Sequence, residues 1–156
     1  MAEIELLTKA LDSAHWELGE SLSGMPDDDL WQRASPQLWS VGELVSHIGY
    51  WEAMSILGDS YKNPLFSELT RYHSLPLGEG LNLPMSTQVL VRELSRVHLD
   101  CSKKLIEVPL DTQDLNPLRG NWTWGETLTY QAFHVAYHTG QIYSVRHLFN
   151  HETPDN

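Results

Sequence analysis

The sequence has little cysteine and little positive charge. Cys101 is the single cysteine among 156 residues, which excludes an intramolecular disulfide framework and suits a reducing compartment. Lys and Arg number 10 against 21 Asp and Glu, a formal net charge of −11. This acidic balance opposes binding to phosphate backbones, so we expect no nucleic-acid partner. The small basic groups are interpreted as a solvated helix face: Lys103 with Lys104, and Arg92 with Arg96.

Long apolar runs and a basic N-terminus are also missing. No stretch of about eighteen apolar residues occurs, and residues 1–5 lack the positive charge that begins a signal peptide. We therefore expect a soluble, cytoplasmic protein with no membrane partner. Because 41% of the residues are hydrophobic and no linker-like change in composition divides the chain, residues 1–156 are expected to form a single domain with a sizeable core.

Two segments of the chain have closely related sequences, WSVGEL at 39–44 and WTWGET at 122–127. In each, a hydroxyl residue precedes a glutamate at the spacing of a capping box. The hydroxyl accepts a hydrogen bond from the first helical turn, and the carboxylate reaches back toward the cap and suits the positive end of the helix dipole. Both segments are predicted helix starts, and the boxes pair Ser40 with Glu43 and Thr123 with Glu126.

Apolar periodicity and helix-breaking residues predict four helices. The segment 59–85 contains several Pro and Gly residues, too many for a regular element, and we expect a long crossover loop there. A connection of about 25 residues can return the chain along a bundle, so the helices before and after it can run parallel. The predicted helices span about Ala2–Leu22, Ser40–Gly58, Ser86–Val108 and Thr123–Asn150.

Three histidines, His47, His134 and His138, lie on the inward-facing sides of the second and fourth predicted helices. Given a rise of ~1.5 Å per residue from the two helix starts, antiparallel helices would bring the three imidazoles to one height. Parallel helices would leave them ~9 Å apart in height. The sequence therefore predicts one shared site between antiparallel helices.

The histidine trio has two interpretations. A lone histidine on an apolar helix face, such as His47, is more often a hydrogen-bonded core residue than a metal ligand. However, burying three imidazoles in one low-dielectric core is costly, and a bound cation removes the difficulty. Three imidazoles also leave positions open on a divalent metal, as in catalytic sites. Such a site lowers the pKa of a bound water or thiol, and its ligands suit zinc, nickel or iron.

The segment WSVGELVSHI at 39–48, followed far downstream by HVAYHTGQI at 134–142, resembles the DinB-like (DinB/YfiT-like) family of metalloenzymes. The resemblance covers nearly the whole chain, including the first helix and the acidic connector 25–30. It implies an all-α four-helix bundle of up-down-down-up topology, a homodimer, and metal ligands at His47, His134 and His138. Some members of the family are transferases or isomerases that depend on low-molecular-weight bacterial thiols.

The residues and the resemblance together predict a metal-dependent enzyme. We expect a thiol-dependent transferase that acts on a small electrophilic molecule, or a hydrolase that uses metal-bound hydroxide. The alternative is a non-catalytic, stress-related binding or dimerisation bundle whose metal is structural or absent.

Helical spacing indicates further candidates around the trio. Gln141 lies one turn beyond His138 and Glu43 one turn before His47. Both are therefore candidates to orient a metal-binding histidine without contacting the metal themselves. For Glu43 the capping role is the stronger interpretation. Tyr50 and Trp51 are predicted to be core residues rather than pocket residues.

The remaining histidines and the cysteine have weaker signals. Cys101 lies on an apolar stripe and is predicted to pack in the core. His147 and His151 repeat the spacing of His134 and His138 but point away from the apolar arc, so we predict that both are solvated. His73 could cover the open metal face, whereas His15 and His98 receive no predicted role.

Overall fold

The computed structural model describes residues 3–67 and 80–154 of the chain. Within these residues it contains the four predicted helices, and their described ends lie within two residues of the predicted limits. A short 3-10 helix, η1 (Asp27–Asp29), follows the first of them. The helices are α1 (Glu3–Leu22), α2 (Val41–Ile56), α3 (Thr87–Glu107) and α4 (Trp124–Leu148).

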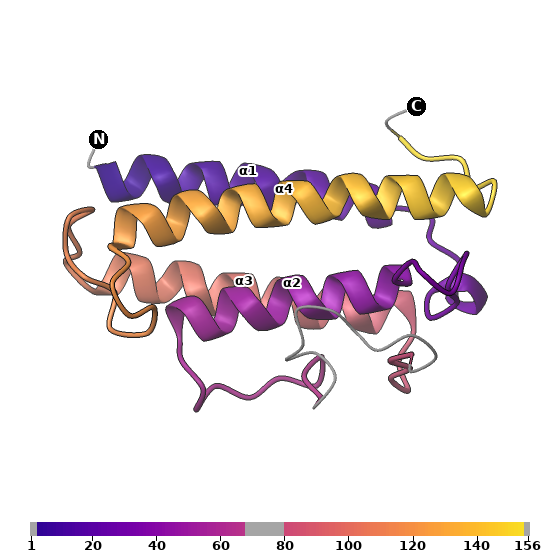
Figure 1. Ribbon diagram of the computed structural model, residues 1–156, viewed down its shortest axis with the longest axis horizontal. Coiled ribbons are helices and arrows are strands. Elements are labelled where there is room, and N and C mark those ends of the chain that lie inside the picture. The colour runs from indigo at the N-terminus through magenta and orange to yellow at the C-terminus, as the bar shows by residue number, and fades with distance from the viewer. Residues whose placement is uncertain (1–2, 68–79, 155–156) are drawn as a thin grey trace.

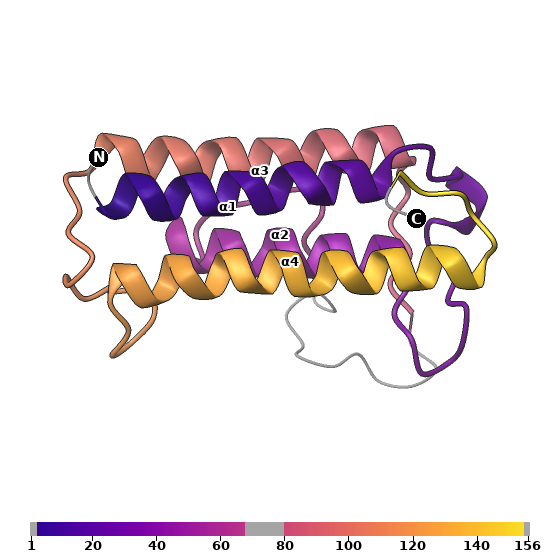
Figure 2. The ribbon, with the colours of Figure 1, turned by 90° about the horizontal axis from the view of Figure 1, so that it is seen from above.

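The four helices form an up-down-down-up bundle, in which α1 and α4 run in one direction and α2 and α3 in the other (Figure 1, Figure 2). Contacts join α1 to α4, α4 to α2, α2 to α3 and α3 to α1. The segment 57–86 therefore connects two parallel helices, although the part of the predicted loop at 68–79 lies outside the described residues. Because α2 and α4 are antiparallel neighbours, the three histidines can lie at one height along the bundle, as a shared site requires.

Aliphatic side chains from all four helices fill the centre of the bundle. The buried residues recur at the three- and four-residue spacings from which the helices were predicted. None of the described helices has both the length and the apolar character that a membrane span requires. Fully buried core members include Leu11, Leu18, Ile48, Leu90, Leu128 and Ile142.

Both predicted capping boxes are confirmed. Ser40 Oγ accepts from Glu43 N at 3.2 Å while the Glu43 carboxylate accepts from Ser40 N at 2.7 Å, and α4 begins with the same pair of bonds. The structure also explains the glycine that the two starts share. Gly42 donates its N–H to Leu30 O at 2.8 Å, and Gly125 donates to Thr112 O at 2.9 Å. Each helix start is therefore held by an approaching loop that leaves little room for a side chain.

We expect Gly125→Ala to lower the free energy of unfolding by about 1–3 kcal/mol, the usual cost of overpacking. A Cβ at this position would lie 2.9 Å from Thr112 O, and a backbone carbonyl cannot move away easily. Gly140 is the matched control, because it lies within α4 and a Cβ there would meet no atom within 4 Å. Gly140→Ala should raise stability by about 0.5–1 kcal/mol. Urea denaturation measures the unfolding free energy of both variants. Equal changes in the two would contradict the explanation.

Arg146 joins the end of α1 to the segment after α4 in a way that the sequence did not indicate. Its side chain is 1% exposed, and its guanidinium donates to the carbonyl oxygens of Ser21, Ser23 and Glu152. The last carbonyls of a helix lack partners within the helix and carry partial negative charge, so a cation suits this place at the end of α1. Burial lowers the pKa of the Arg146 guanidinium despite the nearby Tyr143.

The prediction that His147 and His151 are both solvated is wrong for His151. His147 is exposed, whereas His151 is partly buried, with its Nε2 2.9 Å from Asp29 Oδ2. Helical spacing did not apply to His151, because α4 ends at Leu148 and Asn150 adopts a φ of 59° that turns the chain back. The described tail therefore packs against the connector after α1.

Candidate metal centre

The bundle brings His47, His134 and His138 together between α2 and α4. The Nε2 atoms of His47 and His134 are 3.2 Å apart, and the centroid of the His138 ring lies 4.9 Å from that of His47 and 4.5 Å from that of His134. The three residues are 6, 7 and 8% exposed in sequence order. The predicted shared site is therefore present as a compact, buried group of imidazoles.

The geometry of the trio fits a metal ion. Each residue offers one ring nitrogen, and these nitrogens all lie within 4.8 Å of one another. Two nitrogens bound to one tetrahedral zinc at about 2.0–2.1 Å would be about 3.4 Å apart, close to the separation of His47 and His134. Three imidazoles are also a common ligand set for an open site. The trio could therefore hold a divalent metal, and ligation itself stays a prediction.

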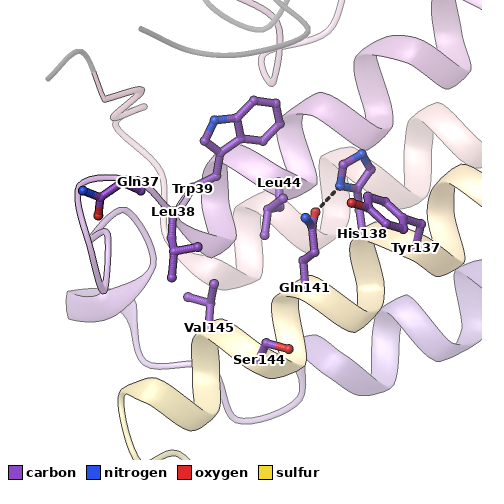
Figure 3. A pocket seen from close by; sticks show the side chains of 9 residues that line it. All are labelled: Gln37, Leu38, Trp39, Leu44, Tyr137, His138, Gln141, Ser144 and Val145. Carbon is purple, nitrogen blue, oxygen red and sulfur yellow. Dashed lines mark hydrogen bonds between the residues drawn. The ribbon is translucent and has the colours of Figure 1, made fainter. Parts of the chain in front are cut away.

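Gln141 fixes the orientation and the tautomer of His138. His138 Nδ1 lies 2.5 Å from Gln141 Oε1, and since an amide oxygen only accepts, Nδ1 carries the proton and Nε2 keeps its lone pair (Figure 3). Burial lowers the pKa of His138 and outweighs the opposite effect of this hydrogen bond. The neutral imidazole is the form that binds a metal.

Glu43, the other predicted orienting residue, contacts the helix start and two loops. Besides closing the capping box with Ser40, its carboxylate accepts from the Arg33 guanidinium at 2.7–3.2 Å and from Leu81 N at 2.8 Å. The contact with Ser40 is the capping role that the sequence favoured for Glu43. The contacts with Arg33 and Leu81 join the connector before α2 and the chain after residue 80 to the start of the helix.

Two cavities border the trio, and Tyr137 and His138 line both. The larger, of about 400 Å³, extends toward the start of α2, and its side chains are drawn in Figure 3. The smaller, of about 260 Å³, borders all three histidines. The other residues of the larger cavity are Gln37, Leu38, Trp39, Leu44, Gln141, Ser144 and Val145. Those of the smaller are His47, Trp51, Arg119, Tyr130, Gln131, Phe133 and His134.

Aromatic rings surround the imidazoles, and the sequence analysis missed most of them. The ring centroids of Trp39 and Trp51 lie 4.9 and 6.4 Å from that of His47, and Tyr130 stacks on His134 at 5.8 Å. The prediction that Trp51 is a core residue rather than a pocket residue is wrong, because it follows His47 by one turn on the same helix face.

Two other predictions concern residues away from the trio. Cys101 is fully buried in the core, as predicted, and burial, together with the charges of Glu52 and Asp100, raises the pKa of its thiol well above the ordinary value. This thiol stays protonated and is no nucleophile at neutral pH. His73, predicted to cover the metal face, lies outside the described residues.

The fold and the site together define a four-helix bundle with a three-histidine group that could bind a metal ion. The family model of the DinB superfamily matches residues 10–142, a span that contains all three histidines and Gln141. The chain therefore belongs to the DinB superfamily. In the two other comparisons, no curated protein and no solved structure matched it.

Proposed function

We propose that this protein is a metal-dependent enzyme that transfers a low-molecular-weight thiol to a small electrophilic molecule. The observation that carries the proposal is that His138 lines two cavities, because a transfer between two substrates needs room for both beside one reactive centre. Hydrolysis of the electrophile by an activated water is the nearest variant and would use the same centre.

The chain supplies the ligands, their orientation and the shape of the site. His47, His134 and His138 would hold a zinc, nickel or iron ion, which would lower the pKa of a thiol or water bound beside it. Gln141 keeps the proton on Nδ1 of His138 and so directs the lone pair of its Nε2. The rings of Trp39 and Trp51 lie beside His47 and give the site apolar walls.

The two cavities differ in ways that suit two substrates. The larger one combines apolar walls, including Leu44 and Val145, with the amide of Gln141, and we assign it to the thiol compound. The smaller one includes Arg119, whose guanidinium lies 4.6 Å from the ring centroid of Trp122. This cation would attract an electrophile that carries a negative group. We further propose a cytoplasmic location, where such thiols are kept reduced.

The test is turnover. Metal-loaded, untagged protein should conjugate a panel of low-molecular-weight thiols to a chromogenic electrophile, and a chromogenic ester tests the hydrolytic variant. His138→Ala should lower kcat/KM by at least about 100-fold, because it removes a ligand next to both cavities. His147→Ala, an exposed histidine on the same helix, should leave kcat/KM unchanged. Equal turnover in the two variants, or none in the parent with any metal, would overturn the proposal.

A non-catalytic bundle that binds or dimerises is the second candidate. It is favoured by exposed aromatic side chains on α4, where Phe133 and Tyr137 are 60 and 54% exposed and stack on each other at 5.9 Å. Such a surface suits a second copy of the chain. In this case Phe133→Ser should convert a homodimer into a monomer in light-scattering measurements without affecting metal content.

A further inference from the structure

A second group of metal-binding side chains lies across the bundle from the trio. Glu52 projects from α2 into the core, where its side chain is 0% exposed. His15 of α1 and His98 of α3 each face one of its oxygens, with His15 Nε2 2.5 Å from Oε2 and His98 Nδ1 2.8 Å from Oε1. Three helices therefore contribute one residue each to this cluster.

His98 has a carboxylate on each side of its ring. Its Nε2 lies 3.0 Å from Asp12 Oδ1 while its Nδ1 faces Glu52. Both contacts are favourable only if each nitrogen carries a proton or if one nitrogen binds a cation. A histidine that contacts a carboxylate through one nitrogen and a metal through the other is the usual arrangement around a bound metal.

We propose that Glu52, His15 and His98 form a second site for a divalent metal ion. Their donor atoms all lie within 4.8 Å of one another, the same limit that the trio meets. Two imidazoles and one carboxylate suit zinc, iron(II) or manganese, and the negative charge of Glu52 favours a dication in the core. Asp12 would hold the second nitrogen of His98 and orient its ring.

An ion can reach this cluster from the surface. His15, His98 and Asp12 line a groove of about 570 Å³ whose other residues come from α1 and α3, two helices in direct contact (Figure 2). The His15 and His98 side chains are 8 and 18% exposed. Water from the groove could complete the coordination of a metal held by three protein ligands.

Metal binding requires one change in the cluster. The rings of His15 and His98 stack with centroids 3.8 Å apart and planes 16° from parallel. Lone pairs in the ring planes converge on one ion only when the rings are tilted, so a side-chain rotation must accompany binding. The ion then replaces the protons that join both imidazoles to Glu52, and its affinity should rise with pH.

The test uses the double variant His47→Ala/His134→Ala, in which the trio keeps a single histidine. Calorimetric titration with zinc at pH 7.5, and the visible absorption of cobalt(II), should still give one equivalent of bound metal. Adding Glu52→Gln should weaken this binding by at least about 100-fold, because the amide loses the charge and the anionic ligand. Circular dichroism checks the fold, and His15→Gln replaces Glu52→Gln if the latter unfolds.

Asp12 provides a finer test on an exposed side chain. Asp12→Asn should lower zinc affinity of the second site by about 10–100-fold, the usual effect of losing a partner that orients a ligand. Glu5 is an exposed acidic residue on the same helix, so Glu5→Gln is the matched control and should leave this zinc affinity unchanged. Absence of bound metal in the double variant, or binding that Glu52→Gln and His15→Gln leave intact, would overturn the proposal.

Discussion

Replacing His134 by alanine is expected to remove the metal ion from the trio and to leave the bundle folded. The substitution removes one of the three proposed ligands, and the Nε2 of His134 lies 3.2 Å from that of His47 at the centre of the group. The affinity of a site with so few ligands should then fall by several orders of magnitude. Elemental analysis of untagged protein measures the loss, and the Glu52→Gln background separates this metal from any bound at the second cluster. The expected change is from about one equivalent to nearly none.

Gln141 and His147 complete this series. Gln141→Ala should lower metal affinity by about 10–100-fold, since it removes the acceptor that orients His138 but no ligand. His147→Ala should keep the full equivalent, because this exposed residue lies beyond the trio on α4. Full metal retention in His134→Ala, or equal losses in all three variants, would show that the trio is a polar core without a metal.

The contribution of Glu52 and His98 to the stability of the metal-free protein is expected to be largest between about pH 4.5 and 6.5. Although burial alone raises the pKa of Glu52, the charges and hydrogen bonds of His15 and His98 outweigh it and lower the pKa from 4.5 to about 2. The corresponding stability, of order 3 kcal/mol, is fully present above pH 4.5 and is lost as the pH falls toward 2.

His98 limits the stability on the alkaline side. Burial lowers its pKa, but hydrogen bonds and charges from Glu52 and Asp12 outweigh this effect and raise the pKa above 6.5. Its contribution is therefore complete below pH 6.5 and is lost as the pH rises through the raised value. The two contributions come from shared ion pairs, so they are not added together.

Urea denaturation in the presence of a chelator, between pH 3 and pH 9, measures this dependence. The difference in unfolding free energy between the parent and Glu52→Gln isolates the cluster from other titrating groups, including the trio. This difference should be largest near pH 5.5 and should shrink toward both ends of the range. A difference that does not change with pH would mean that the cluster is not ionised as its contacts indicate.

Local sequence determined the helices and the faces that they bury. The capping boxes at Ser40 and Thr123 depend on residues within one helical turn, so their pattern fixes where α2 and α4 begin. Apolar residues at three- and four-residue spacings then place His47, His134 and His138 on buried faces. For antiparallel second and fourth helices, that information was sufficient to predict that the three histidines lie together.

Tertiary structure alone decided which residues from different helices share a site. His15, Glu52 and His98 come from three helices and have no common spacing in the sequence, so only the packing of the bundle brings them together. The carbonyl partners of Arg146 likewise belong to segments far apart in sequence, the end of α1 and the tail after α4. Helical periodicity describes one helix at a time, whereas contacts between helices depend on how the four are rotated and ordered around a common core.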